Sequence, residues 1–296
     1  MHLWDSYKLG FSINYLGMYG ETSAKHSISK KIKMGVYNSF RRIAPIDYVR
    51  WRELSFVYEA IDNLAIAPKR VLDISSPKLL PLTIARKCPQ AMVHSGDIVE
   101  AEVSLVEKAK YCLKMKNITA HIEDARNLSF PDNYFDLITS ISVFEHIAPE
   151  IGGEIPASRE LKRVLAPGGI AILTVPFARE SFAEYVKGSI YERTANSDEA
   201  IFFQRFYDTS LLKKNIIEPS ALELVALKFI DERFFYKDPR KRLSHYINSS
   251  TYQNLIFGSF YPILARIFLS EPKALEDCQK PYIACLVMEK RCCASA

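Results

Sequence analysis

From residue 69 onward, short apolar runs alternate with amphipathic stretches long enough to form helices. This alternation is typical of a parallel sheet whose strands are joined by crossover helices. It predicts strands at residues 70–74, 91–95, 117–122, 134–140, 169–175, 221–231 and 281–289. Helices are predicted at residues 48–64, 79–87, 102–115, 157–165 and 209–217, the fourth of them closed by a turn at Pro167-Gly168-Gly169. The sequence therefore predicts a doubly wound α/β fold.

The composition is that of an ordinary globular protein. Hydrophobic residues make up 48% and charged residues 25% of the 296 residues, which excludes disordered, collagen-like and coiled-coil chains. The six cysteines have no paired zinc-site spacing, and we expect no metal site. Because the N-terminus has no uninterrupted apolar run of a secretory signal and no segment has the length of a membrane span, we expect a cytoplasmic protein.

The positive charge is concentrated near the N-terminus. Residues 1–52 hold nine Lys or Arg against three Asp or Glu, so the rest of the chain is close to neutral although the whole carries +5. Such an arm can meet nucleic acid or anionic lipid, or it can simply be a solvated surface. The main domain gives no strong nucleic-acid signal.

Four segments are predicted. They are a basic N-terminal helical arm at 1–47, a core at 48–233, an inserted aromatic cap at 234–276, and the last strand with the C-terminal tail at 277–296. The insertion carries Arg240-Lys241-Arg242 and an apolar run at 255–269, which together allow peripheral membrane contact through residues 240–269. We favour a cap over the sheet edge, because Pro262 interrupts the helical face.

Polar residues follow four of the predicted strands. Asp73 ends the first and leads into a loop with Ser75, Ser76 and Pro77, Asp97 follows the second, Asp124-Ala125 follows the third, and a segment reaching Glu145 and His146 follows the fourth. The carboxyl edge of such a sheet is where ligands bind, and a carboxylate after the second strand is typical of a ribose contact.

At these positions the chain resembles the class I S-adenosylmethionine-dependent methyltransferases, of the broad small-molecule, type 11-like group. The resemblance rests on residues 71–86, 96–100, 123–147 and 160–177, in the family's order and spacing, and extends over about residues 50–235. It implies a Rossmann-like, mostly parallel seven-stranded sheet ending in an antiparallel hairpin. It also implies S-adenosylmethionine as cofactor and transfer of its methyl group to an oxygen, nitrogen or carbon of a small molecule.

The resemblance implies a role for each matching position. Asp73 and the loop of Ser75, Ser76 and Pro77 would line the methionine half of the cofactor. Asp97 would hold the ribose hydroxyls and Ile98 would touch the adenine, with Asp124 and Ala125 at its amine. The remaining matches are Ser140, Ile141 and Ser142, which would lie along the cofactor, and Glu145 and His146, which would face the substrate.

One departure from the family pattern concerns the loop after Asp73. Three positions that are usually glycine, to allow positive φ and close approach of the ligand, are Ser75, Pro77 and Leu79. Pro77 also removes an N–H donor, although Ser76 as N-cap and Pro77 as first helical residue would preserve the helix start. The serine hydroxyls could replace the lost donors.

Structural alternatives exist for each carboxylate. Asp73 can satisfy loop N–H groups, Asp97 can cap the following helix, and Asp124 can begin a turn with Arg126. His146 can act as a general base, yet His146 beside Glu145 can also be a capping pair. Methyl transfer from a sulfonium depends mainly on positioning, so catalysis does not require a base.

Two other functions remain open from the sequence. One is a catalytically inactive binding or scaffold protein that keeps the fold but has lost the glycine loop. The other is a nicotinamide-dependent oxidoreductase, which the missing G-x-G-x-x-G motif argues against. The sequence does not identify the methyl acceptor, which we expect under residues 178–208 and 234–276, or the oligomeric state.

Overall fold

A seven-stranded sheet forms the centre of the computed structural model, which describes residues 3–15, 45–65, 67–188, 190, 193, 196, 198–234, 242–243, 257 and 260–291. Its strands are β1 (Arg70–Ile74), β2 (Met92–Asp97), β3 (Ile118–Ile122), β4 (Phe135–Ile141), β5 (Leu165–Pro176), β8 (Glu223–Asp231) and β9 (Pro281–Glu289). They are ordered β3-β2-β1-β4-β5-β9-β8, with β9 antiparallel to both neighbours and the other adjacent pairs parallel. The predicted fold class is confirmed.

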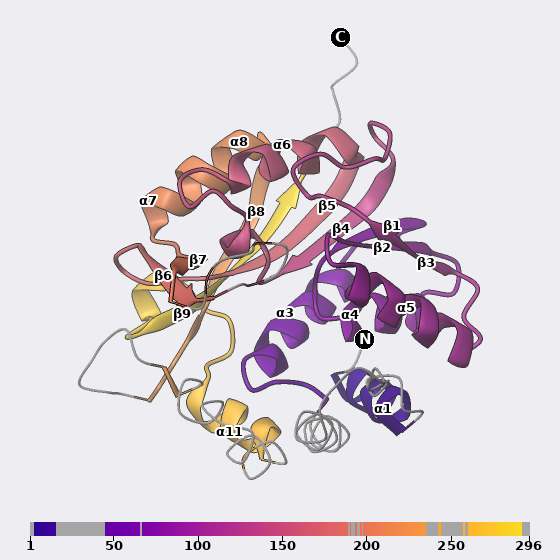
Figure 1. Cartoon of the computed structure of the whole chain (residues 1–296), viewed down its shortest axis with the longest axis horizontal. Coiled ribbons are helices and arrows are strands. Elements are labelled where there is room, and N and C mark those ends of the chain that lie inside the picture. The colour runs from indigo at the N-terminus through magenta and orange to yellow at the C-terminus, as the bar shows by residue number, and fades with distance from the viewer. Residues whose placement is uncertain are drawn as a thin grey trace.

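Helices cover both faces of the sheet (Figure 1). One layer contains α3 (Arg50–Asp62), α4 (Leu79–Lys87) and α5 (Glu100–Cys112). The other contains α6 (Glu154–Val164), α7 (Thr209–Leu212), a π-helical turn (Lys213–Ile217) and α8 (Glu218–Ser220). Successive strand residues point to opposite layers, since Val71 belongs to the first apolar cluster and Leu72 to the second.

The strands differ from the sequence prediction in two places. β5 begins at Leu165, so Pro167-Gly168-Gly169 lies within a strand and not in a turn before it. The register against β4 shifts between Phe135 and Leu137, which accommodates the irregular residues. The second difference is a separate hairpin of β6 (Phe182–Lys187) and β7 (Ala200–Phe206), which the sequence did not predict as a paired unit.

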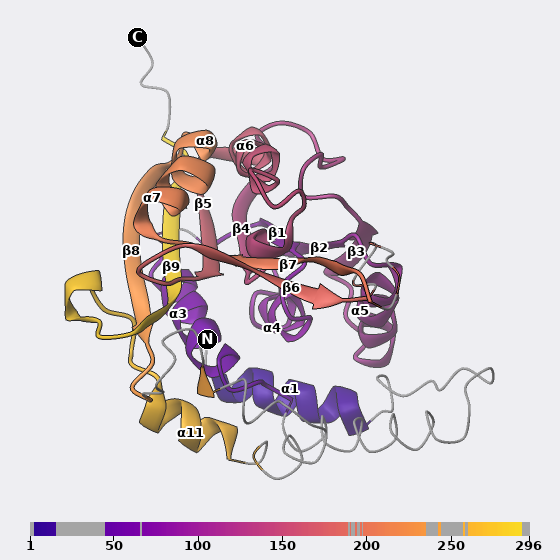
Figure 2. The same cartoon turned by 60° about the vertical axis from the view of Figure 1, so that its left-hand side comes forward.

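The start of the basic arm belongs to the folded core. Helix α1 (Leu3–Tyr15) packs against α4 and α3 (Figure 2), and its Leu9 is fully buried. The Ser6 hydroxyl lies 2.7 Å from the Thr83 hydroxyl of α4. Gly10 allows close approach, because a Cβ there would lie 2.4 Å from Pro45 Cβ. Most of the arm's basic residues fall within 16–44, outside the described residues.

The insertion packs against α3. Its helix α11 (Tyr261–Phe268) buries Tyr261 and Ala265, whereas Phe260, Ile263 and Ile267 are each more than half exposed. Arg240-Lys241 and most of the predicted apolar run before residue 260 lie outside the described residues. In the part of the chain that the structure describes, no helix combines the length and apolarity that crossing a membrane requires.

Candidate functional site

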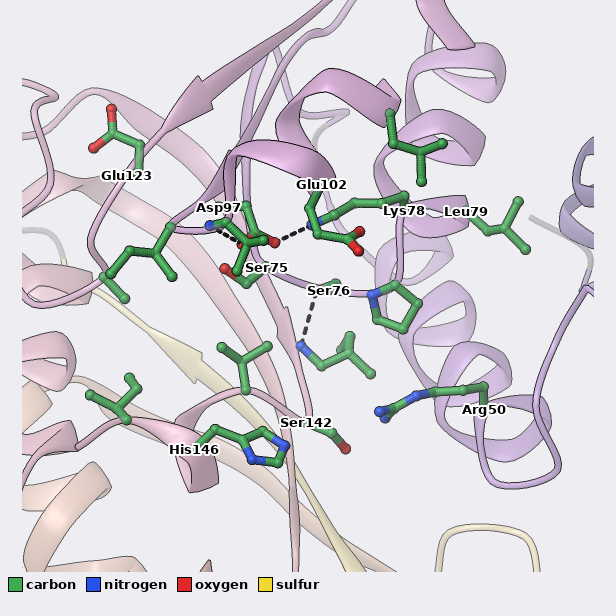
Figure 3. A pocket seen from close by; sticks show the side chains of 18 of the residues that line it. Arg50, Ser75, Ser76, Lys78, Leu79, Asp97, Glu102, Glu123, Ser142 and His146 are labelled. Carbon is green, nitrogen blue, oxygen red and sulfur yellow. Dashed lines mark hydrogen bonds and ion pairs between the residues drawn. The ribbon is translucent and has the colours of Figure 1, made fainter. Parts of the chain in front are cut away.

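A cavity of about 650 Å³ opens at the carboxyl edge of the parallel strands. Its walls come from the segments after β1, β2, β3 and β4 and from residues 45–54 around the start of α3. A volume between about 300 and 1,000 Å³ is typical of a small-molecule site. Figure 3 shows Lys78, Asp97 and Glu102 on one side of this cavity and Arg50, Ser142 and His146 on the other.

The loop after β1 keeps a glycine-like backbone without glycine. Ser75 has φ of 52°, in the left-handed region, and its N–H donates to the Gly96 carbonyl at 2.8 Å. The Ser76 hydroxyl accepts from the Ile141 N–H at 3.0 Å and thereby ties the loop to β4. Helix α4 begins at Leu79, as predicted. The expected roles of Ser76 as N-cap and of Pro77 as first helical residue are wrong, because Lys78 is the N-cap, no side chain caps the helix and Pro77 lies outside it.

Asp73 lies behind this loop. It is fully buried, accepts a hydrogen bond from Thr139 Oγ1 at 2.7 Å, and is not among the cavity-lining residues. Burial raises its pKa to about 6. Ser75, Ser76 and Pro77 line the cavity in front of it. Asp73 is thus bonded to β4 behind the loop and does not reach the cavity, where its motif position implied contact with the cofactor.

Asp97 faces the cavity from the end of β2. Its Oδ2 lies 2.5 Å from Lys78 Nζ, and its Oδ1 accepts from the Val99 N–H at 2.9 Å. The Lys78 and Asp97 side chains are 5% and 9% exposed. Helix α5 begins after Val99, so Asp97 organises the turn before that helix as well as presenting a carboxylate to the cavity.

In the turn after β3, the carboxylate of Asp124 is hydrogen-bonded to the neighbouring Arg126. Asp124 accepts hydrogen bonds from the Arg126 backbone N–H at 2.9 Å and from the Arg126 guanidinium, and these contacts lower its pKa. Asp124 therefore forms the turn with Arg126 that the sequence offered as an alternative to an adenine contact. Ile98, expected to touch the adenine, and Ala125, expected at its amine, both line the cavity.

The β4 wall contains two of the three predicted residues. Ile141 and Ser142 line the cavity, whereas Ser140 is fully buried and donates to the Ile74 carbonyl at 3.2 Å. Ser140 is therefore bonded to the end of β1 and, unlike Ile141 and Ser142, does not reach the cavity.

A buried glutamate of α3 links this wall to Arg50. Glu53 Oε1 accepts from the hydroxyls of Ser142 and Thr174, each at 2.6 Å. Glu53 Oε2 lies 2.5 Å from Nη1 of Arg50, which lines the cavity. Helix α3 is thereby joined to β4 and β5, and Arg50 is held at the cavity wall by a buried carboxylate.

His146 lines the cavity in a short 3-10 turn after β4 (Phe144–His146). Its Nδ1 lies 2.9 Å from the Phe203 carbonyl, so this nitrogen carries the hydrogen, and its Nε2 lies 3.7 Å from Glu145 Oε1. Burial lowers the pKa of His146 to about 4 and raises the pKa of Glu145 to about 8. Both are therefore largely uncharged at neutral pH. Glu145 is buried and does not line the cavity, so its side chain is not placed to face a substrate there.

Arg205 of β7 supports the His146 turn from behind. Its guanidinium donates to the carbonyls of Phe144, Ile147 and Pro149 at 2.8 to 3.1 Å. It also lies 2.8 Å from Glu154 Oε2, with both side chains buried. The unpredicted hairpin therefore fixes the backbone of a cavity wall.

Arg50 and Lys78 line the cavity but were not singled out from the sequence. Arg50 belongs to a helix that meets the sheet edge only in the folded structure, so the sequence does not indicate the contact. For Lys78, the only indication in the sequence was its position in the altered loop. Conversely, no described residue of 178–208 or 234–276 lines the cavity, so the predicted covering of the pocket by these segments is wrong for the residues described.

The cavity carries more acidic than basic groups. The ionisable residues other than His146 that line it are Asp47, Arg50, Lys78, Asp97, Glu102, Glu123, Asp124 and Arg126. The Glu123 carboxylate accepts a hydrogen bond from the backbone N–H of Ser129 at 2.9 Å. The acidic surplus favours a ligand with positively charged groups.

Comparison with known proteins finds a match to one family in the part of the chain that forms the cavity. Residues 77–173 match the sequence model of a family described as a methyltransferase domain. The match begins within the cavity segment after β1 and includes those after β2, β3 and β4, but it extends over less than half of the chain. Among curated proteins, none shows significant similarity to this sequence.

Solved structures with a similar fold share little sequence. A coclaurine N-methyltransferase bound to N-methylheliamine and SAH has a TM-score of 0.51 and 12% identity, covering 96% of this chain and 94% of its own. An O-methyltransferase of a polyketide synthase multienzyme from Brevibacillus brevis, in complex with S-adenosyl-L-homocysteine, has a TM-score of 0.52 and 15% identity, with coverages of 91% and 81%. A methyltransferase from Methanosarcina mazei has a TM-score of 0.50 and 17% identity, with coverages of 79% and 98%. These similarities establish the fold.

Proposed function

Because the chain carries a methyltransferase domain on the class I methyltransferase fold, we propose that it is an S-adenosylmethionine-dependent methyltransferase. The methyl group would pass to an oxygen, nitrogen or carbon atom of a small molecule. The observation that carries the proposal is the cavity at the carboxyl edge of β1 to β4, with Asp97 facing into it. An open α/β sheet binds its ligands at this edge.

The described residues fit this cofactor. Asp97 presents a buried carboxylate suited to ribose hydroxyls, and Ile98 and Ala125 offer apolar surface to an adenine ring. The loop of Ser75, Ser76 and Pro77 would lie along the methionine portion. The acidic surplus of the walls complements the sulfonium and the ammonium of the cofactor. When bound, the cofactor supplies a methyl group activated by the positive charge of its sulfur.

His146 is suited to receive a proton from the methyl acceptor. It lines the cavity, and its low pKa keeps the imidazole unprotonated at neutral pH. The hydrogen bond from Nδ1 to the Phe203 carbonyl leaves Nε2 as the basic nitrogen, close to Glu145. A base with so low a pKa is weak, so its main contribution would be to accept a hydrogen bond and orient the acceptor.

One observation favours a second candidate, a binding or scaffold protein without activity. Lys78 lies where its ammonium neutralises Asp97, and the loop retains none of the three usual glycines. A ligand that uses Asp97 must share this carboxylate with Lys78. The two functions differ in whether the chain binds the cofactor.

Calorimetric titration with S-adenosylmethionine and S-adenosylhomocysteine tests the proposal. We expect binding in the micromolar range and a loss of roughly 10- to 100-fold for Asp97→Ala, since a buried charged acceptor is removed. Asp97→Asn keeps the side-chain shape, and Asp132→Ala, at a surface site where the carboxylate is 67% exposed, is the matched control. NAD serves as a ligand of another class. Absence of cofactor binding by the folded protein would refute the proposal and favour the scaffold.

A further inference from the structure

Lys78 places an ammonium group inside the cavity. It precedes α4, lines the cavity and is 6% exposed as a residue. Its Nζ forms the ion pair with Asp97 Oδ2 (Figure 3). An ammonium has three donors, and this ion pair employs one of them. The lysine can therefore hold Asp97 and a second acceptor at the same time.

The other side chains of the loop are committed to structure. The Ser76 hydroxyl accepts from the Ile141 N–H and is hydrogen-bonded to the Asp73 carboxylate, and the Ser75 hydroxyl points to the Gly96 carbonyl at 3.4 Å. Pro77 has no N–H to donate. The serines therefore do not replace the donors that a glycine-rich loop would offer to an anionic ligand group, contrary to the sequence-based expectation. Lys78 provides the remaining side-chain donor of this loop at the cavity.

We infer that Lys78 is a cofactor-binding residue that holds the carboxylate of the cofactor's amino-acid portion. This inference rests on the proposed function. The same ammonium then bridges that carboxylate and Asp97, so the lysine compensates for the lost glycines and orients the carboxylate that faces the ribose. A charge-assisted hydrogen bond in a buried site is stronger than a neutral one, and the flexible lysine stem allows the ammonium to serve two acceptors.

The experiment compares two ligands that differ only in the carboxylate. Wild-type protein and Lys78→Met are titrated with S-adenosylmethionine and with its decarboxylated form. We expect the wild type to prefer S-adenosylmethionine by about 10- to 100-fold, as for a hydrogen bond between charged groups. Lys78→Met should lose this preference while its affinity for the decarboxylated form changes less than about threefold. Lys78→Arg should retain part of the preference.

The matched control is Lys110→Met on the outer surface of α5, where Lys110 pairs with Glu107 at 3.5 Å and does not line the cavity. Thermal unfolding of each variant establishes that it is folded. If Lys78→Met is not folded, the preference of the wild type and the response of Lys78→Arg decide the question.

Three results would overturn the inference while leaving the proposed function intact. The first is equal affinity of the wild type for the two ligands. The second is an equal loss of affinity for both ligands in Lys78→Met, which would mean that the lysine acts only at the ribose end. The third is a gain of affinity for both ligands in Lys78→Met, which would mean that the lysine competes with the ligand for Asp97. If the wild type binds neither ligand, the proposed function itself fails. That outcome is distinct from the other three.

Discussion

On the β2 side of the cavity, Lys78 and Asp97 face each other as a buried ion pair, whereas on the β4 side burial keeps His146 and Glu145 uncharged at neutral pH. The difference follows from the partners. Each charge of the first pair has an opposite charge at 2.5 Å. For Glu145, the cost of burying a charged carboxylate exceeds the stabilisation by the surrounding arginines, so the neutral form is favoured. One wall is thus built for binding charged ligand groups, and the other for holding uncharged groups in a fixed position.

Arg205 keeps the β4 wall in place, so its removal should have the largest effect. Arg205→Met would leave Glu154 as an uncompensated buried carboxylate and would free three backbone carbonyls. We expect a loss of about 3–5 kcal/mol in the free energy of unfolding, measured by urea denaturation. The control is Arg159→Met, on the exposed side of α6, which should change stability by less than about 0.5 kcal/mol. Equal effects of the two substitutions would contradict this role of Arg205.

Glu145 should make stability depend on pH. Its folded pKa is raised from 4.5 to about 8, so the unfolded chain releases its proton first, and stability falls as pH rises through this interval. Glu145→Gln removes this pH dependence. The free energy of unfolding of the variant, relative to that of the wild type, should therefore increase by up to about 1.36 kcal/mol for each pH unit. Urea denaturation between about pH 5 and pH 8 measures the difference. Glu59→Gln, on the exposed face of α3, should show no such trend, and a constant difference for Glu145→Gln would show that the carboxyl is ionised throughout.

The smallest effect concerns His146 itself. Because burial lowers its pKa to about 4, the ring should stay neutral as the pH falls from neutrality to about 5.5. In NMR spectra recorded over this range, the ring resonance that disappears in His146→Gln should hardly move. A midpoint near the ordinary value for histidine would mean that the β4 wall is more solvated than the structure indicates.

The sequence predicted the sheet because its signal is local. Apolar runs mark β1 to β5 and the last two strands, with ends displaced by a few residues at several strands. The hairpin of β6 and β7 was missed, since its strands are only partly buried and their exposure does not follow a simple alternation. The match to a methyltransferase domain confirms the resemblance that the motifs indicated.

The site was harder to predict because side-chain partners are a tertiary property. The motif after β1 pointed to Asp73, yet Asp73 lies behind the loop and Lys78 faces the cavity. Arg50 reaches the same cavity from α3, whose distance along the chain from the strand ends conceals the contact. Residues 178–208 and 234–276 were expected to cover the pocket, but the described insertion helix packs on α3 instead.

A crystal structure of the protein with S-adenosylhomocysteine tests the central claim most directly. The account predicts the ribose at Asp97, the adenine between Ile98 and Ala125, and the amino-acid carboxylate at Lys78. Binding of the ligand elsewhere, or a cavity left empty at saturating ligand, would contradict the assignment of this cavity as a cofactor site.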